Sequence, residues 1–168
     1  MKKVLTGQKM RTLDLDTIEK YGLSEYILIE RAALSFFDEI EHSISFDDNI
    51  YIFCGRGNNG ADGMALGRIL FLKKYNVKIF LLDNSSSSES LSAGAKYEIG
   101  IIEKYNIPTY DFSEQDGKCN IIIDSIFGTG LNRELDQSIV SYIDLINELK
   151  IKKNCLVYGM DIPSGVSS

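Results

Sequence analysis

The chain has 168 residues, of which 44% are hydrophobic and 25% are charged, as in an ordinary globular domain. Its net charge of −6 argues against binding to nucleic acids or anionic membranes. No apolar stretch approaches the roughly 20 residues that span a bilayer. The single histidine, His42, excludes histidine-based triads and histidine-rich zinc sites as the basis of function. The length predicts a single domain over residues 1–168.

Two amphipathic helices are expected at the N-terminus. The first covers residues 6–21, with Thr6 as its N-cap and Gly22 at its end. The second follows Ser24 and presents apolar residues on one face as far as Ile40. Because both helices precede the first predicted strand, we expect them either to pack against the completed sheet or to form a homodimer interface with a second copy.

Strands and helices alternate from residue 50 onward. The pattern predicts an α/β fold with a doubly wound, mostly parallel sheet in a Rossmann-like three-layer αβα arrangement. The chain stops soon after its last strand, so we expect a C-terminally truncated domain whose sheet is incomplete at the C-terminus. The expected strands are 50–54, 77–82, a short edge strand at 107–110, 119–124 and 155–160, and the expected helices are 61–74, 90–105 and 137–150.

Three of the predicted strands end in residues that packing alone does not explain. The first is followed by a glycine-rich segment, Gly55–Gly63, and the others lead into Asp124–Leu131 and Asp161–Gly165. Aspartate is depleted from strands, and a buried charge needs a partner. Since ligands bind at the C-terminal ends of parallel strands, we expect the three segments to line one crevice.

The glycine-rich segment allows more than one interpretation. Residues 55–60 spell G-x-G-x-x-G, the fingerprint of dinucleotide-binding domains, and Asp83 has the spacing of a carboxylate that holds a ribose hydroxyl. An NAD-dependent oxidoreductase is therefore one hypothesis. Against it, Asp62 adds negative charge where a pyrophosphate would bind.

Oxygen-bearing side chains at the same three strand ends support a different hypothesis. Asparagine side chains offer acceptor oxygens as well as donors. With Asp124 and Ser164, the asparagines Asn58 and Asn59 could supply oxygen ligands to a hard cation.

The three segments resemble the signatures of the NAD(P)H-hydrate epimerases, the YjeF N-terminal domain family that includes the apolipoprotein A-I binding proteins. The resemblance is carried by residues 57–63, 124–130 and 161–165, and residues 10–14 and 28–33 resemble the opening helices of that family. It extends over nearly the whole chain.

The resemblance implies an activity, a cofactor and a setting. The activity is interconversion of the R and S epimers of hydrated NADH and NADPH (NADHX and NADPHX) at C6, which supplies a separate NAD(P)H-hydrate dehydratase. The implied cofactor is a potassium ion bound by Asn59, Asp124 and Ser164. A cytoplasmic location is expected. The implied substrate-binding residues are Asn58, Asn59, Gly60, Ala61, Asp62, Gly128, Thr129, Gly130, Leu131, Asn132, Arg133, Glu134 and Asp161.

The chemistry of the reaction indicates a catalytic carboxylate. Inversion at C6 moves protons to and from oxygen, and no histidine is near these segments, so a carboxylate is the natural general acid or base. We predict that Asp161 has this role, because Asp124 would be engaged with the cation. Ala61 stands where the family usually has glycine, which is tolerable if its φ is negative. A non-catalytic nucleotide-binding module on the same fold remains the alternative.

The cysteines Cys54, Cys119 and Cys155 form no C-x-x-C pair, and their odd number excludes a full disulfide framework. We expect reduced, structural thiols. Cys54, beside the glycine-rich turn, is the one expected to face a ligand.

Overall fold

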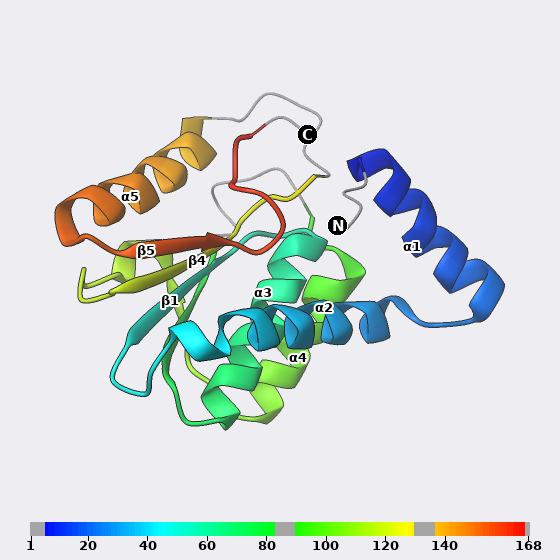
Figure 1. The fold of residues 1–168 in the computed structure, drawn as a ribbon, viewed down its shortest axis with the longest axis horizontal. Coiled ribbons are helices and arrows are strands. Elements are labelled where there is room, and N and C mark those ends of the chain that lie inside the picture. Colours follow the sequence, from blue (N-terminus) through cyan, green and yellow to red (C-terminus); the bar gives the residue numbers. More distant parts are fainter. Residues whose placement is uncertain (1–5, 83–89, 130–136, 167–168) are drawn as a thin grey trace.

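The computed structural model describes residues 6–82, 90–129 and 137–166, which form a five-stranded sheet with helices on both faces (Figure 1). The strand order is β3-β2-β1-β4-β5, and every neighbouring pair is parallel. Chain order reverses between β1 and β4, so these two strands flank the switch point of the sheet. The strands are β1 (Asn49–Cys54), β2 (Asn76–Leu81), β3 (Thr109–Asp111), β4 (Ile121–Ser125) and β5 (Leu156–Gly159).

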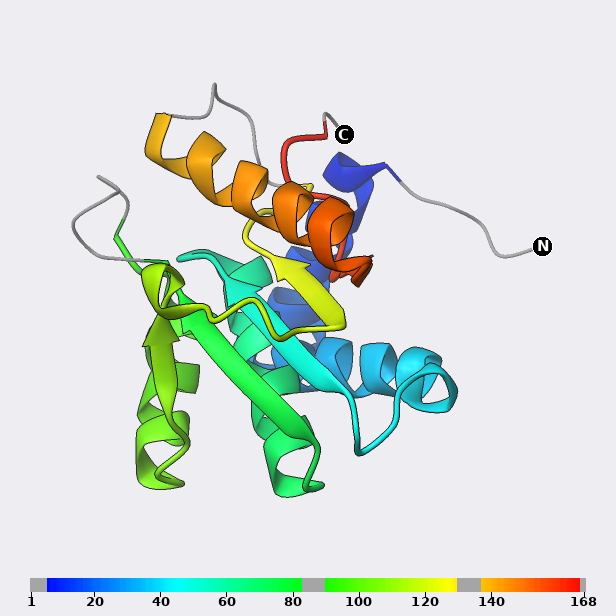
Figure 2. The ribbon, with the colours of Figure 1, turned by 90° about the vertical axis from the view of Figure 1, so that its left-hand side faces the viewer.

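The helices complete a three-layer arrangement. Helices α2, α3 and α4 cover one face of the sheet, and α5 covers the other (Figure 2). The predicted doubly wound α/β fold is therefore confirmed. The helices are α1 (Gly7–Tyr21), α2 (Glu25–Ile40), α3 (Asn58–Leu72), α4 (Ala93–Lys104) and α5 (Gln137–Lys153), and two 3₁₀ turns are η1 (Glu41–Ser43) and η2 (Phe112–Glu114).

The ends of the first two helices follow from their sequence. The side chains of Thr6 and Ser24 accept hydrogen bonds from the backbone N–H groups of Lys9 and Ile27, so both act as N-caps as predicted. Gly22 closes α1 in the left-handed conformation, with φ of +70°. Helix α2 buries an apolar stripe in the core, whereas α1 has no buried residue. The expectation of packing against the sheet thus holds for α2 and not for α1.

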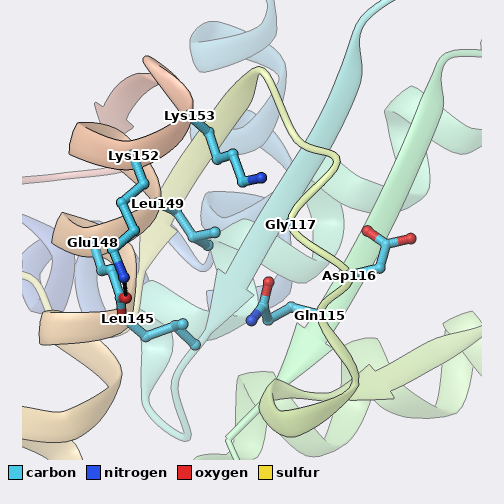
Figure 3. A pocket seen from close by; sticks show the side chains of 8 residues that line it. All are labelled: Gln115, Asp116, Gly117, Leu145, Glu148, Leu149, Lys152 and Lys153. Atoms are coloured by element: carbon cyan, nitrogen blue, oxygen red, sulfur yellow. Dashed lines mark hydrogen bonds and ion pairs between the residues drawn. The ribbon is translucent and has the colours of Figure 1, made fainter.

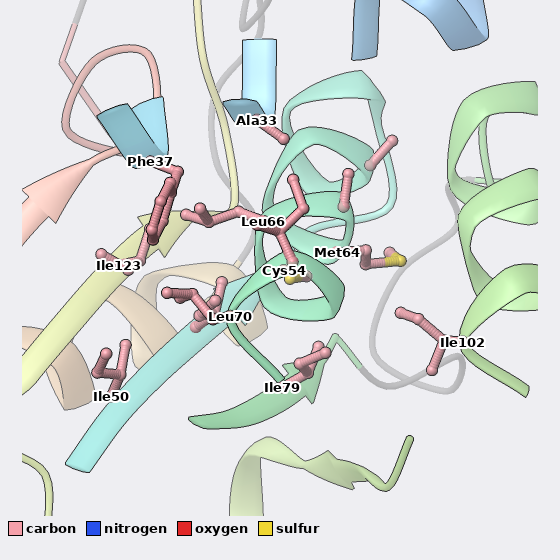
Figure 4. Packing of buried hydrophobic residues seen from close by; sticks show 14 of the residues in the cluster. Ala33, Phe37, Ile50, Cys54, Met64, Leu66, Leu70, Ile79, Ile102 and Ile123 are labelled. Carbon is pink, nitrogen blue, oxygen red and sulfur yellow. The ribbon is translucent and has the colours of Figure 1, made fainter. Parts of the chain in front are cut away.

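Alternating residues of β1 build the two halves of the core. Ile50 and Ile52 point toward α2, α3 and α4, while Tyr51 and Phe53 point toward α5. The first half is mostly aliphatic and includes Phe37 of α2, as Figure 4 shows. Cys54 belongs to it and is fully buried, and it lines a small cavity beside the glycine-rich turn, so the expectation that this thiol faces a ligand stays a prediction.

Two element boundaries differ from the prediction in ways that shape the site. Helix α3 begins at Asn58 and not at residue 61, because the glycines let its first turn form directly against the end of β1. Asp124 lies inside β4, followed by Ser125, and is not the last residue of the strand. Within the described part of the chain, no helix combines the length and apolar character needed to cross a bilayer.

Candidate functional site

The glycine-rich segment brings the start of α3 against the ends of β1 and β4. A Cβ atom on Gly55 would overlap the backbone of Ile126, and one on Gly60 would overlap the backbone of Gly55. A Cβ on Gly63 would overlap the side chain of Ser125. None of these three glycines has a positive φ, so glycine is needed here for close packing and not for an unusual backbone conformation. The N-terminus of α3, with its unpaired N–H groups, is thereby held at the switch point.

Asp124 accepts three hydrogen bonds from the segments around it. It is 6% exposed, and its Oδ2 accepts from the backbone N–H of Ser164 at 2.8 Å. Its Oδ1 accepts from the hydroxyl of Ser164 at 2.6 Å and from the N–H of Ile126 at 3.2 Å. The Ser164 hydroxyl in turn accepts from the N–H of Phe127 at 2.9 Å. The segments that follow β4 and β5 are therefore joined through one buried carboxylate.

Asn59 lies beside this network. Its backbone carbonyl accepts a hydrogen bond from the hydroxyl of Ser125, the residue after Asp124. Its side-chain nitrogen and oxygen are both buried and have no hydrogen-bond partner in the described structure. Buried polar atoms are rarely left unpaired, so the Asn59 amide is available to a bound group.

The donor set suits a hard cation of low charge. The amide oxygen of Asn59, the hydroxyl of Ser164 and the carboxylate of Asp124 are oxygen ligands of the kind that such ions prefer. The described residues contain no cluster of three or more His, Cys, Asp or Glu side chains able to hold a metal ion. One carboxylate with neutral oxygens fits a monovalent ion better than a site for a divalent one.

Asp161 reaches across to the segment after β4. Its Oδ2 accepts from the backbone N–H of Thr129 at 2.7 Å. A Cβ atom on Gly128 would lie 2.5 Å from the same oxygen, so a larger residue at that position would displace the carboxylate. The Asp161 side chain is otherwise exposed at the open edge of the sheet. The structure thus brings together three predicted site residues, Asp161, Gly128 and Thr129.

Asp62, one turn into α3, faces the same opening. Burial, followed by the negative charge of Asp161, raises the pKa of Asp62 to about 8. Weaker contributions come from Asp14 of α1, Glu98 of α4 and Glu25 of α2. Burial is thus the main reason that Asp62 favours its protonated form, and the carboxylate of Asp161 adds to it.

The remaining residues of the α3 segment have distinct surroundings. The side-chain amide of Asn58 donates to Glu25 Oε1 at 2.6 Å, which links the site to the first turn of α2. Ala61 is fully buried and its φ is not positive, so the methyl group is accommodated as the sequence predicted. The predicted site residues Gly130, Leu131, Asn132, Arg133 and Glu134 lie outside the described residues, as does Asp83.

Comparison with known proteins decides the family. Residues 25–168 match the family described as the YjeF-related protein N-terminus. This chain belongs to that family.

Relatives and a solved structure agree with this assignment. An NAD(P)H-hydrate epimerase of Leuconostoc sp. (strain C2) is 35% identical over 166 residues, which is 99% of this chain and 70% of the relative. One from Oenococcus oeni (strain ATCC BAA-331 / PSU-1) is 31% identical over 98% of this chain and 75% of its own length. The crystal structure of yeast ynu0 has the same fold, with a TM-score of 0.82 at 19% identity, over 98% of this chain and 72% of the yeast chain.

Two contacts of this YjeF-related site were not predicted from the sequence. Ser125 fixes the first turn of α3 through Asn59, and its position directly after Asp124 was the available signal. The N-terminal end of α1 also reaches the site, because a Cβ atom on Gly7 would lie 2.8 Å from the Cβ of Thr129. No local pattern in α1 indicates that contact, which depends on where the helix is placed.

One cavity of this YjeF-related domain lies near the C-terminal ends of the strands and another lies near their N-terminal ends. A small one of about 70 Å³ adjoins the glycine-rich turn and is lined by Gly55, Met64 and Leu82 among others. A larger one of about 300 Å³ lies between residues 115–117 and the C-terminal half of α5 (Figure 3). The three motifs follow the C-terminal ends of the strands, whereas the larger cavity lies near the N-terminal ends. None of the predicted site residues lines it. It is therefore not the candidate active site.

Proposed function

We propose that this YjeF-related protein is an NAD(P)H-hydrate epimerase, an isomerase that interconverts the R and S epimers of NADHX and NADPHX at C6. The observation that carries the proposal is the meeting of three signature segments at one switch point, in a chain that is similar to named epimerases along nearly its whole length. The oxidoreductase hypothesis gains no such support.

The reacting carbon determines what the site must do. C6 of the hydrated ring carries a hydroxyl next to the ring nitrogen, so inversion requires the C–O bond, or the ring, to open and close again. Either route transfers protons at oxygen. We assign the acceptor role to Asp161, which is exposed at the opening. Asp62, held largely protonated near neutral pH, is placed to donate.

Substrate binding is assigned to the segments that surround these two carboxylates. Helix N-termini favour phosphate groups, and the first turn of α3, from Asn58 to Asp62, faces the opening. Gly128 and Thr129 supply the facing wall, and Gly130, Leu131, Asn132, Arg133 and Glu134 are proposed to extend it.

A potassium ion is proposed as the cofactor. Asn59, Asp124 and Ser164 would hold it, in agreement with the unpaired amide of Asn59. When bound, the ion supplies a positive charge that offsets the carboxylates and the substrate phosphates.

We propose a homodimer formed through the N-terminal helices, since α1 has caps at both ends and no buried residue. A helix of this length is marginal without tertiary packing.

A separate NAD(P)H-hydrate dehydratase is the proposed consumer of the product. We also propose a cytoplasmic location.

The test is the rate at which NADHX epimers equilibrate. A sample enriched in one epimer is incubated with and without the full chain, and the two epimers are separated by chromatography. We expect equilibration to be faster with the wild type and about 10²- to 10⁴-fold slower with Asp161→Asn. Asp47→Asn, an exposed aspartate before β1, is the matched control and should behave as the wild type.

Each alternative gives a different result. A wild-type rate equal to that in buffer would overturn the function, and retained nucleotide binding would then identify a binding module. A wild-type rate with Asp161→Asn would overturn only the catalytic assignment.

A further inference from the structure

Two cysteines that the proposed function does not use lie in contact near the N-terminal ends of β4 and β5, away from the site. The sulfur atoms of Cys119 and Cys155 are 3.3 Å apart although 36 residues separate them in the chain. Cys119 lies shortly before β4 and Cys155 lies directly before β5. The pairing of Ile121 with Leu156 places the two cysteines in adjacent rows of neighbouring strands.

We propose that Cys119 and Cys155 form a reversible disulfide, which makes the N-terminal ends of β4 and β5 an oxidation site. Disulfide sulfurs are about 2.05 Å apart, so the two atoms must approach by roughly 1.2 Å. Small side-chain rotations in neighbouring strands can supply that movement. The third thiol, Cys54, is buried in the other half of the core and has no such partner there.

The surroundings set the speed of the reaction. Cys119 and Cys155 are 4% and 5% exposed, and burial raises the pKa of the Cys119 thiol to about 12. The thiolate is the reactive form, so oxidation is slow at neutral pH. The thiol of Cys155 also donates to the Cys119 carbonyl oxygen at 3.0 Å, and this hydrogen bond is lost on oxidation.

The larger cavity lies on the same side of the core as this pair, although neither cysteine lines it. It opens between residues 115–117 and α5, and its wall includes Leu149, which packs in the same cluster as both cysteines (Figure 3). A small oxidant such as hydrogen peroxide can enter a cavity of about 300 Å³. The charged groups at this cavity are Asp116, Glu148, Lys152 and Lys153.

The reaction balances with hydrogen peroxide as the oxidant. One thiolate attacks a peroxide oxygen, the O–O bond breaks, and a sulfenic acid and one water result. The second thiol's sulfur attacks the sulfenic sulfur, the S–O bond breaks, and a second water leaves. The two sulfurs lose two electrons and two protons, and both are taken up by the peroxide. A low-molecular-weight dithiol reverses the bond by exchange.

A disulfide at this position fastens the start of the edge strand β5 to its neighbour. Cross-linking restricts the unfolded chain and stabilises the folded one. For a loop of this length in a chain of this size, we expect the midpoint of thermal unfolding to rise by roughly 5–10 °C.

The test uses the full chain treated with hydrogen peroxide at pH 8.5, followed by thiol blocking, intact-mass analysis and a tryptic map. Trypsin cuts after Lys118, Arg133 and Lys153, so the two cysteines lie on separate peptides, 119–133 and 154–168. We expect a mass loss of about 2 Da, a linked pair of these two peptides and the higher unfolding midpoint, all reversed by dithiothreitol.

Variants separate this pair from general thiol oxidation. Cys54→Ala should still form the link, whereas Cys119→Ser and Cys155→Ser should lose both the mass change and the gain in midpoint. The wild-type peptide map decides the question even if a serine variant does not fold. Oxidation of single cysteines without a link, a link that includes Cys54, or three unmodified thiols would each overturn the proposal.

Discussion

Ser164 holds the carboxylate of Asp124 with both its backbone N–H and its hydroxyl, at 2.8 and 2.6 Å. The two residues are 40 positions apart, and their bonds join the segment after β5 to the interior of β4. The same hydroxyl accepts from Phe127 N–H, so it is an acceptor and a donor at once. Ser164 therefore fixes the orientation of Asp124 and the path of the chain that carries Asp161.

Replacing Ser164 by alanine should destabilise the protein. The change leaves the N–H of Phe127 without its acceptor and removes one donor from a buried carboxylate. We expect the free energy of unfolding to fall by about 1–3 kcal/mol, measured by urea denaturation. Ser113→Ala is the matched control, because its hydroxyl also donates to an aspartate, Asp111, at an exposed position. Its effect should be below about 0.5 kcal/mol. Equal losses in the two variants would contradict this account.

Gly60 and Gly100 both lie in helices and should respond in opposite directions to alanine. A Cβ atom on Gly60 would overlap the backbone of Gly55, which cannot move without separating α3 from β1. We expect Gly60→Ala to cost at least about 2 kcal/mol of unfolding free energy. Nothing lies within 4 Å of a Cβ atom on Gly100, so Gly100→Ala should stabilise by about 0.5–1 kcal/mol. Thermal unfolding of the two variants tests this, and a stabilised Gly60→Ala would show that the first turn of α3 is not fixed by close packing.

Much of this architecture could be predicted because it depends on local patterns. Apolar runs alternating with amphipathic segments gave the strands, the helices and their order. The position of Asp124 and Asp161 near the ends of parallel strands then predicted that both would lie at one edge. Caps such as Thr6 and Ser24 were also predictable, because they bond to backbone groups three residues away.

The features that could not be predicted depend on contacts between distant segments. The start of α3 at Asn58 is decided by how closely its first turn packs on β1. The protonation of Asp62 depends on burial and on Asp161, which is distant in the chain. The contact between Cys119 and Cys155 depends on the register of β4 and β5. Periodicity and propensity carry no information about these distances.

Helix α1 provides a test of the proposed homodimer. Leu13 is 48% exposed, and Met10 and Tyr21 are also exposed on this helix. If a second copy covers α1, Leu13→Lys should place a charge in the interface and shift the protein from dimer to monomer. Sedimentation at micromolar concentration should then give the 18.8 kDa chain mass for the variant and about twice that mass for the wild type. Ile151→Lys, at an exposed position of α5, is the control and should leave the dimer intact. A monomeric wild type would overturn the proposal.

The raised pKa of Asp62 predicts a specific dependence of stability on pH. The pKa of an unfolded aspartate is about 3.9, whereas that of Asp62 in the folded protein is about 8. Between these values the unfolded chain loses its proton first, so this group lowers the free energy of unfolding as the pH rises from about 4 to about 8.

Asp62→Asn removes that penalty. Its stability relative to the wild type should be smallest near pH 4 and should grow by at least about 1 kcal/mol by pH 8, measured by urea denaturation without added potassium. Asp116→Asn should show the opposite trend. Hydrogen bonds from Tyr51 and Lys78 lower the pKa of Asp116, so the wild type gains stability from this group above the unfolded pKa and loses it in acid. A difference between Asp62→Asn and the wild type that does not change with pH would show that Asp62 is not held protonated by its surroundings.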